Sequence, residues 1–186
     1  MKFCSHCAAA VSHKIPPGDS LPRYVCDHCQ TIHYQNPRMV VGCIPQWEDK
    51  ILMCRRAIEP RYGLWTLPAG YMENGETLAD GAARETMEEA CARVKVGPLY
   101  TVYNIPHVNQ VYLLFRAQLL DLNFRPGTES LETQLMTEAE IPWEHIAFAT
   151  IRETLKHFFA DRARQQFELH VGTIERPAQP MKIEPR

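Results

Sequence analysis

Short apolar segments separated by turn-forming residues predict a series of strands in the part of the chain after residue 38. The first two segments are separated by Pro45 and by the acidic pair Glu48 and Asp49, which suit a turn. Later segments alternate between apolar and polar positions, as strands with one buried face do. The predicted strands are residues 39–44, 50–54, 64–67, 99–105, 108–120 and 131–136.

Two further segments have the spacing of helices. Residues 77–94 form the first, and residues 146–164 form the second, with apolar side chains at intervals of three and four. The apolar positions of the second helix are Ile151, Leu155, Phe158 and Phe159. Strands interleaved with two helices favour an α/β (α+β) fold in which a mixed sheet is covered on both faces.

The helix predicted over residues 77–94 gathers three carboxylates on one side. Thr77 followed by Asp80 gives a capping-box pattern at its start. At about 100° per residue, the side chains of Glu85, Glu88 and Glu89 fall within one arc of about 100°. The opposite side carries Ala79, Ala83, Met87, Ala90 and Val94. We therefore expect this apolar stripe to pack on the sheet and the carboxylates to point away from it.

Such a cluster of carboxylates predicts a metal site. Like charges three and four residues apart destabilise a helix by about 0.2–0.5 kcal/mol per pair, and Arg84 offsets only part of this cost through Glu88. A solvated acidic face is the alternative, but such a face normally carries lysines at i+4, and this one does not. Carboxylate oxygens on one rigid element suit Mg²⁺, with substrate phosphate and water completing its shell.

Four of the seven cysteines form two Cys-x-x-Cys pairs. Cys4 pairs with Cys7 and Cys26 pairs with Cys29, and eighteen residues separate the two pairs. Two such turns facing each other give the tetrahedral thiolate set that Zn²⁺ binds, so we expect a zinc ribbon over residues 1–35. The alternatives are free or redox-active thiols, or a thiolate replaced by a nearby histidine. These histidines are His6, His13, His28 and His33.

Composition and charge argue against several classes of protein. The 186 residues contain no run of about eighteen apolar residues, so no membrane span is predicted. Residues 1–7 lack the apolar stretch of a secretory signal, so we expect a cytoplasmic protein with reduced thiols. A formal net charge of −2 argues against a broad electrostatic nucleic-acid binder, because that role needs a basic face.

Residues 70–92 resemble the Nudix box, the Gly-x5-Glu-x7-Arg-Glu-U-x-Glu-Glu-x-Gly-U pattern of hydrolases of nucleoside-diphosphate-linked compounds, where U is a bulky aliphatic residue. The matching positions are Gly70, Glu76, Arg84, Glu85, Glu88 and Glu89. The sequence departs from the pattern at Thr86, Cys91 and Ala92. These departures concern helix packing and the helix end, and they leave the acidic residues intact.

Further segments resemble the branch of this family that includes the plant-type FAD and ADP-ribose pyrophosphatases. They are residues 33–37, 55–61, 65–70, 110–112, 129–132 and 140–143. Zinc-binding NADH pyrophosphatases share the ribbon and the box, but they carry a Ser-Gln-Pro-Trp-Pro-Phe-Pro segment that this chain lacks. The resemblance implies a zinc ribbon over residues 1–35, a Nudix-type α/β/α sandwich with a mixed sheet over 36–170, and a tail over 171–186.

The resemblance also implies a reaction, the Mg²⁺- or Mn²⁺-dependent hydrolysis of a diphosphate. The expected substrate is FAD, cleaved to FMN and AMP, or ADP-ribose. The implied metal ligands are Glu85, Glu88, Glu89 and the carbonyl oxygen of Gly70. Glu76 and Arg84 are implied to hold the loop before the helix. The general base would come from the box or from Glu129 or Glu132, of which we prefer Glu132.

Several side chains are candidates for substrate contacts, each with a plainer alternative. Arg55 and Arg56 present bidentate donors suited to phosphate, and the alternative is that they are solvated charges at a strand end. Some aromatic residues are candidates to stack on adenine or flavin, and a place in the core is their alternative. They are Trp65, Tyr71, Tyr103 and Tyr112.

Other functions compete with this interpretation. An NADH or capped-RNA pyrophosphohydrolase would use the same box, and a Nudix-fold sensor would bind such a ligand without cleaving it. The presence of every box glutamate favours an enzyme over a sensor. Residues 1–35 carry few basic residues, so we expect no nucleic-acid partner. We expect a homodimer, because members of this family often complete their sites across two chains.

Overall fold

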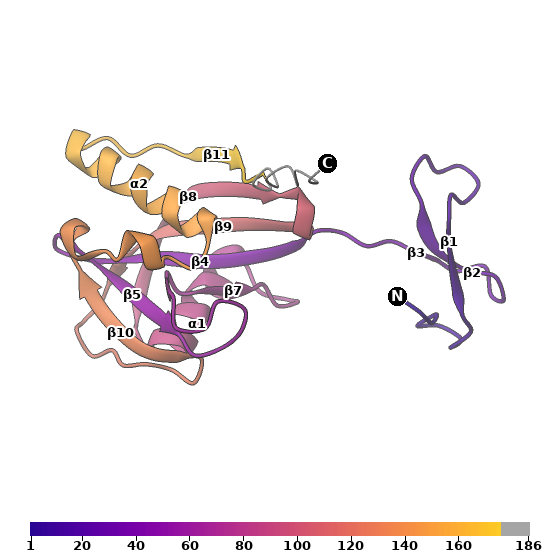
Figure 1. Cartoon of the computed structure of the whole chain (residues 1–186), viewed down its shortest axis with the longest axis horizontal. Helices are drawn as coiled ribbons and strands as arrows, with labels where there is room; N and C mark the ends of the chain where they lie inside the picture. The colour runs from indigo at the N-terminus through magenta and orange to yellow at the C-terminus, as the bar shows by residue number, and fades with distance from the viewer. Residues whose placement is uncertain (176–186) are drawn as a thin grey trace, which may run out of the picture. The chain divides into compact units, whose positions relative to one another are not determined.

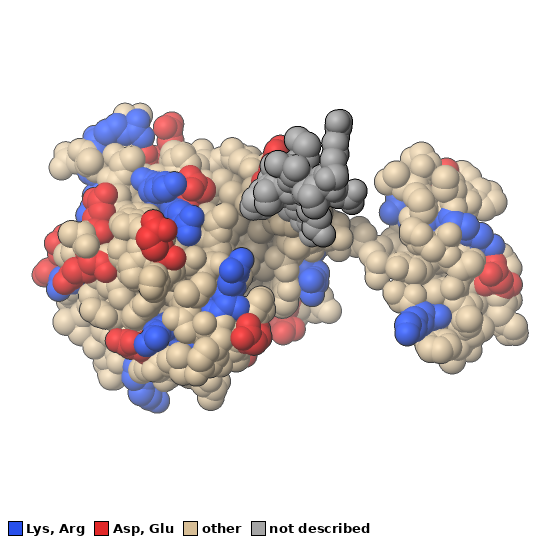
Figure 2. Space-filling view, in the orientation of Figure 1, with Lys and Arg blue, Asp and Glu red and all other residues tan. Residues whose placement is uncertain are grey.

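The computed structural model describes residues 1–175 of the chain (Figure 1). Its internal contacts divide the chain into two compact units, with the division after Pro37. None of the helices in the described part has the length and apolar character needed to cross a membrane. On the face shown in Figure 2, acidic and basic side chains are interspersed, so that face carries no broad basic surface.

The first unit is a three-stranded antiparallel sheet in the order β1-β2-β3. Its strands are β1 (Val11–Lys14), β2 (Arg23–Cys26) and β3 (Ile32–His33). The apolar core of this unit is small, and its buried members are Cys4, Val25 and Cys26. A unit of this size with so little buried apolar surface needs a staple such as a metal ion.

The second unit is built on a mixed sheet in the order β10-β5-β4-β9-β8-β11, with β6 paired to β5 and β7 paired to β4. Its strands are β4 (Arg38–Trp47), β5 (Lys50–Arg56), β6 (Trp65–Thr66), β7 (Ala69–Tyr71), β8 (Val94–Ile105), β9 (Gln110–Leu119), β10 (Ser130–Met136) and β11 (His170–Thr173). The β4–β9 and β8–β11 pairs are parallel. One edge of β4 is shared by two strands. Residues 46–47 of β4 pair with β5, and residues 40–42 pair with β7, so β4 and β5 separate between these two regions.

Two helices cover opposite faces of this sheet (Figure 1). They are α1 (Leu78–Ala90) and α2 (Ala149–Arg164). Alternation along β4 assigns the faces, because Ile44 packs in the core cluster with α2, whereas Val41 and Cys43 pack in the cluster with α1. Three 3-10 helices complete the unit: η1 (Pro106–Val108), η2 (Glu138–Glu140) and η3 (Trp143–His145). The predicted fold class, a helix-covered mixed sheet, is confirmed.

Several predicted boundaries of strands and helices differ from those in the structure. The strand predicted from residue 99 begins at Val94, and its pairing with β9 shifts register on both sides of Leu99, next to Pro98, which has no amide proton to donate. The strand predicted to end at Ile44 continues through Pro45 to Trp47. The helix predicted from residue 146 begins at Ala149.

The C-terminal boundary also differs from the expectation. β11 pairs in parallel with β8, and its residues 170–173 lie opposite residues 101–104. The tail expected from residue 171 therefore begins inside a strand of the main sheet, which is a correction. The remainder of the expected tail, residues 176–186, lies outside the described residues.

Candidate active site and metal centre

Gly70 in β7 allows the box helix α1 to lie close to the sheet. An ideal Cβ on Gly70 would lie 2.3 Å from Oε2 of Glu85, so any side chain here would displace that carboxylate. Gly42 in β4 is equally crowded, since an ideal Cβ there would lie 2.4 Å from the Cβ of Ala69. The two glycines together bring β7 against β4 and Glu85 against β7.

α1 packs on the sheet with a face other than the predicted one. The expected docking stripe consists of Ala79, Ala83, Met87, Ala90 and Val94. Of these only Ala90 is buried and Met87 is 42% exposed, so the expectation is wrong. The helix packs instead through small residues such as Ala82 and Thr86, which allow a close approach. The Thr86 hydroxyl donates to the Ala82 carbonyl at 2.8 Å, so its burial leaves no polar atom unpaired.

Cys91 ends α1 earlier than the predicted residue 94. Its backbone is left-handed (φ 47°), its amide donates to the carbonyl of Met87, and the amide of Ala92 donates to the carbonyl of Thr86. A glycine at this position, as the Nudix pattern has, would adopt this conformation without strain. The chain then turns directly into β8.

Arg84 is the centre of an ion-pair cluster at the loop before α1. Its Nε and Nη2 donate to the two carboxylate oxygens of Glu76 at 3.0 and 2.8 Å, and Nη2 also donates to the Tyr71 carbonyl at 3.1 Å. Its Nη1 donates to Glu85 at 2.7 Å and to the exposed Glu88 at 3.0 Å. The bidentate contact with Arg84 lowers the pKa of Glu76 to about 2. Arg84 therefore ties the loop to the carboxylates of the helix.

Glu85 and Glu89 are the buried carboxylates of the box, at 8% and 7% exposure. Burial raises the pKa of Glu89 to about 8, the charge of Glu85 adds to this rise, and the charge of Arg56 opposes it. Burial also raises the pKa of Glu85, against the hydrogen bond from Arg84. Two desolvated carboxylates that repel each other favour a cation between them.

Of the two downstream glutamates, Glu129 is the one whose charge acts on this pair. Its negative charge contributes to the raised pKa of both Glu85 and Glu89. Glu132 lies in β10, where its Oε2 is 3.7 Å from Nη1 of Arg55. The structure thus pairs Glu132, the base preferred from the sequence, with an arginine, whereas the charge of Glu129 acts on the buried carboxylates.

Gly127 determines where Glu129 lies, and sequence reasoning missed its role. Its amide donates to the Glu89 carbonyl at 2.9 Å, and an ideal Cβ on it would lie 1.7 Å from the Glu88 carbonyl oxygen. The sequence shows a turn at Pro126 and Gly127 but contains no signal that this turn packs on the end of α1.

The two arginines at the end of β5 have different surroundings. Arg56 is the one whose charge lowers the pKa of Glu89, and its Nε donates to the Pro60 carbonyl at 3.0 Å. Arg55 is exposed, and its Nε donates to the Gly63 carbonyl at 3.0 Å. Arg56 is therefore the phosphate-contact candidate that the structure brings to the carboxylates.

The aromatic candidates divide between the core and the surface. Trp65 packs against the core cluster beneath α2, and Tyr103 and Tyr112 are buried in a smaller cluster. Tyr71 is 46% exposed, and its hydroxyl accepts a hydrogen bond from Nε2 of Gln110 at 2.8 Å. Tyr71 is thus the candidate of this group that remains available to a ligand.

The N-terminal cysteines form a set of metal ligands. Among the described residues, they are the one group of three or more potential ligand side chains whose ligand atoms all lie within 4.8 Å of one another. The Sγ separations are 3.7 Å for Cys4–Cys29, 3.5 Å for Cys7–Cys26 and 3.4 Å for Cys7–Cys29. Sulfurs bound about 2.3 Å from a tetrahedral zinc lie about 3.8 Å apart, so the set fits this ion.

The two Cys-x-x-Cys turns share one backbone geometry. Ala8 and Gln30 are both left-handed, with φ of 61° and 60°. Their amides donate to the carbonyls of Cys4 and Cys26, each at 2.9 Å. Matching turns present the two pairs of sulfurs in the same way.

Side chains around the cysteines contact the sulfurs. Nε2 of His33 lies 3.3 Å from Sγ of Cys4, and Oγ1 of Thr31 lies 3.1 Å from Sγ of Cys29. His33, one of the histidines considered as a replacement ligand, therefore lies beside a cysteine sulfur rather than in place of one.

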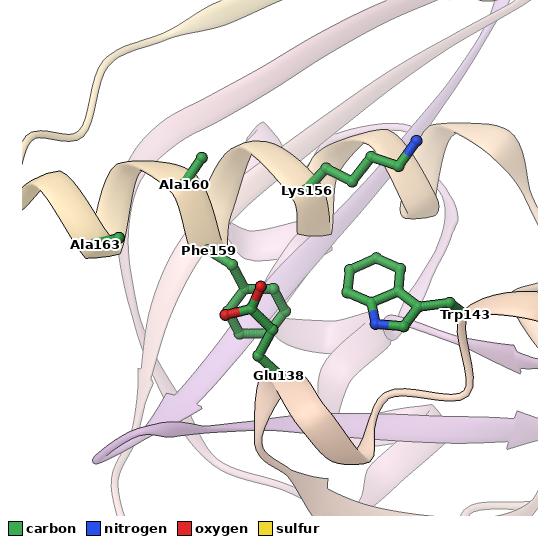
Figure 3. Close-up of a pocket in the computed structure, with 6 residues that line it drawn as sticks. All are labelled: Glu138, Trp143, Lys156, Phe159, Ala160 and Ala163. Atoms are coloured by element: carbon green, nitrogen blue, oxygen red, sulfur yellow. The ribbon is translucent and has the colours of Figure 1, made fainter.

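An open pocket of about 370 Å³ lies along α2, as Figure 3 shows. Its lining residues are Glu138, Trp143, Lys156, Phe159, Ala160 and Ala163. Trp143 packs edge-on against Phe159, with ring centroids 6.1 Å apart, and so anchors α2. None of the predicted site residues lines this pocket, which is separate from the box.

Comparison with known families decides the classification. The zinc-ribbon model described as Nudix N-terminal matches residues 2–35, and the NUDIX domain model matches residues 36–161. The chain belongs to the Nudix hydrolase family. The predicted resemblance, a Nudix hydrolase with an N-terminal zinc ribbon, is thereby confirmed.

A solved Nudix hydrolase from Nitrosomonas europaea is 59% identical to this Nudix chain, with a TM-score of 0.92 over 95% of this chain and all of that one. A solved ADP-ribose pyrophosphatase from Streptococcus suis 89-1591 is 21% identical, with a TM-score of 0.58 over 73% of this chain and 99% of that one. At this identity, the second likeness shows the Nudix fold alone.

Curated relatives of this Nudix chain carry the name NAD-capped RNA hydrolase NudC. The protein from Salmonella heidelberg (strain SL476) is 35% identical over 94 residues, which are 50% of this chain and 35% of the relative. The protein from Salmonella paratyphi C (strain RKS4594) is 28% identical over 144 residues, which are 77% of this chain and 51% of the relative. The chain thus spans a third to a half of the length of these relatives.

Proposed function

We propose that this Nudix chain hydrolyses the diphosphate bond of a nucleoside-diphosphate-linked substrate. The observation that carries the proposal is the pair of buried carboxylates Glu85 and Glu89 within the Nudix domain, of which Glu85 lies against Gly70 and accepts a hydrogen bond from Arg84. Two buried acidic groups are suited to hold a divalent cation, and such a cation together with nearby arginines can hold and polarise a charged diphosphate.

A divalent cation fits these donors, because their mutual repulsion and burial favour positive charge between them. The proposed ligands of Mg²⁺ or Mn²⁺ are Glu85, Glu88, Glu89 and the Gly70 carbonyl oxygen. When bound, the ion would supply charge that polarises the phosphoryl group.

The remaining groups position the substrate and move the proton. Arg56 is proposed to hold a phosphate oxygen, and Arg84 to fix the orientation of Glu85 and the loop at Glu76. Water attacks one phosphorus, the bond from that phosphorus to the bridging oxygen breaks, and Glu129 accepts the proton of the water. We propose Glu129 for this step because its charge reaches the carboxylate pair.

FAD and ADP-ribose are the substrates that we propose first, on the resemblance of several segments to their hydrolases. An NAD-type diphosphate, free or at an RNA end, is the second candidate, because the curated relatives are named for NAD-capped RNA. The missing Ser-Gln-Pro-Trp-Pro-Phe-Pro segment argues for the first choice.

The ribbon and the assembly complete the proposal. We propose that the four cysteine sulfurs bind a structural Zn²⁺, since their separations fit a tetrahedral ion. Homodimerisation and a cytoplasmic location are proposed on the family resemblance and on the composition.

Product analysis tests this proposal. Purified protein with Mg²⁺ is incubated with FAD, ADP-ribose, NADH and NAD-capped RNA, and the products are identified by chromatography and mass spectrometry. FMN and AMP from FAD, or AMP and ribose 5-phosphate from ADP-ribose, support the first choice. Cleavage of NADH or capped RNA alone would move the substrate to the second choice. Tight binding without cleavage would contradict the enzyme and favour the sensor.

A further inference from the structure

Ser130, the first residue of β10, carries a buried hydroxyl without a hydrogen-bond partner. The residue is 8% exposed, and its Oγ bonds to none of the residues that the structure describes. Its backbone is paired, since the amide donates to the Gly127 carbonyl at 3.2 Å. Buried polar side chains are nearly always hydrogen-bonded, so a hydroxyl of this kind indicates a bound water, ion or ligand nearby.

A β-bulge determines the face of the sheet from which this hydroxyl projects. Ser130 pairs with Arg56 of β5, and Glu132 pairs with Arg55, so Leu131 is one extra residue in β10. In a regular strand Ser130 would share the face of Glu132, two residues along. The extra residue places Ser130 on the face of Arg56 instead.

This face of β5 is the one that packs against α1. Cys54, two residues from Arg56, belongs to the same core cluster as Ala90 of α1. Burial raises the pKa of the Cys54 thiol, and the negative charge of Glu89 adds to this rise. The Ser130 hydroxyl and the Glu89 carboxylate therefore belong to the same side of the sheet.

Backbone hydrogen bonds hold the segment before Ser130 on the end of α1. The amides of Arg125 and Gly127 donate to the carbonyls of Ala90 and Glu89, at 3.0 and 2.9 Å. α1 also contacts β10 directly. The side chains of Glu89 and Ser130, both buried, thus lie in the layer between α1 and the β5–β10 part of the sheet.

We propose that the Ser130 hydroxyl positions the Glu89 carboxylate for its metal ion through one bridging water. The inference rests on the proposed function, in which Glu89 is a metal ligand, and it adds a residue outside the Nudix box. A water is required because Oγ of Ser130 makes no direct hydrogen bond in this structure. A hydrogen bond to one carboxylate oxygen fixes the direction of the other, which is how outer-shell partners raise metal affinity. Ser130 is a positioning residue, since it acts through Glu89.

Direct measurement of metal binding tests this proposal without turnover. The full, zinc-loaded chain is titrated with Mn²⁺ alone, and free Mn²⁺ is followed by electron paramagnetic resonance. Ser130→Ala should weaken Mn²⁺ binding about ten-fold, the lower end of the effect of an outer-shell partner. Ser130→Thr keeps the hydroxyl and should bind Mn²⁺ more tightly than Ser130→Ala. Glu89→Gln, which removes a proposed ligand, identifies the site that is titrated.

Thr150 provides a matched control on the opposite face of the sheet. Its hydroxyl is also buried without a partner among the described residues, but it lies on α2. Thr150→Val removes this hydroxyl at nearly constant shape and should leave Mn²⁺ binding unchanged. Melting temperatures establish that each variant is folded.

The outcomes separate this inference from the proposed function. If the wild type shows no Mn²⁺ binding that Glu89→Gln weakens, the proposed metal site fails and the role of Ser130 fails with it. If Glu89→Gln weakens binding but Ser130→Ala binds like the wild type, the metal site stands and the role of Ser130 is overturned. A folded Ser130→Thr that binds no better than Ser130→Ala, or an equal loss in Thr150→Val, would also overturn it, because the Ser130 hydroxyl would then not be the group that matters.

Discussion

At the scale of single residues, the absence of a side chain at Gly70 determines where the Glu85 carboxylate lies. Gly70 has no room for a Cβ, since one would lie 2.3 Å from Oε2 of Glu85. Gly70→Ala should therefore lower kcat about 100-fold, the cost expected when a catalytic group moves by about 1 Å. Steady-state kinetics with the preferred substrate, together with the melting temperature, would check this. A folded variant with the wild-type kcat would contradict the assigned position of Glu85.

His33 provides a second test at this scale. Its Nε2 lies 3.3 Å from Sγ of Cys4, and side chains that hydrogen-bond to a metal ligand typically change metal affinity by about 10- to 100-fold when removed. We expect His33→Ala to release zinc to a chromogenic chelator at least about ten-fold faster than the wild type. His28→Ala is the matched control, because His28 is exposed between Cys26 and Cys29. Equal rates of zinc release from the two variants would show that the contact between His33 and Cys4 does not help to hold the zinc ion.

At the scale of elements, α1 shows what a periodic pattern can and cannot predict. The pattern predicted the helix and its carboxylates, because box residues and the cap at Thr77 are local features. The pattern predicted the wrong packing face of α1. It identifies positions by their apolar character, and it does not show where small side chains let the helix approach the sheet closely. Small residues such as Ala82 lie against the sheet, while the larger Met87 lies outside. Burying Glu85 costs stability, and only the function of the site accounts for it.

Cys91 ends this helix in a conformation that a Cβ disfavours. Its φ is 47°, and left-handed backbone costs a non-glycine residue about 1 kcal/mol. Cys91→Gly should raise the free energy of unfolding by about 1 kcal/mol and the melting temperature by about 2–4 °C. Cys91→Ala is the control, because it keeps the Cβ and removes the thiol. Calorimetric melting of both variants would check this, and an equal gain in both would assign the effect to the thiol.

Asp161 ties α2 to the two strands beneath it. Although burial opposes ionisation, hydrogen bonds from His170, Tyr100 and Arg164 lower the pKa of this fully buried carboxyl. A lowered folded-state pKa means that the stabilisation is fully present above the unfolded value of about 3.9 and is lost as the pH falls below it.

Asp161→Asn should therefore have a pH-dependent effect. At pH 7 we expect it to lower the free energy of unfolding by about 2–3 kcal/mol, as for hydrogen bonds to a charged group. Between about pH 5 and pH 3 the difference from the wild type should shrink. Urea unfolding of the wild type and of Asp161→Asn at several pH values measures the two free energies of unfolding. A difference between them that is constant across this pH range would contradict the ionised state of Asp161.

At the scale of the whole molecule, contacts between distant segments complete the site, and these were not predictable from the sequence. The box motif and the two cysteine pairs are short patterns with fixed spacing, so the sequence alone could indicate both. Which of Glu129 and Glu132 approaches the box depends on the packing of Gly127 on the end of α1, a contact between segments far apart in the chain. The contact between Tyr71 and Gln110 likewise forms because β7, β4 and β9 meet in one register.

The central claim is that the buried pair Glu85 and Glu89 supports metal-dependent hydrolysis of a diphosphate. The most direct measurement is kcat against Mg²⁺ concentration for the wild type, for Glu89→Gln and for Glu132→Gln, with ADP-ribose and FAD as substrates. Glu132→Gln is the matched control, since Glu132 of β10 pairs with Arg55 of β5. Activity that requires Mg²⁺, falls about 100-fold or more in Glu89→Gln and stays near the wild-type value in Glu132→Gln is the predicted result. Wild-type kcat and Mg²⁺ dependence in Glu89→Gln would contradict the account.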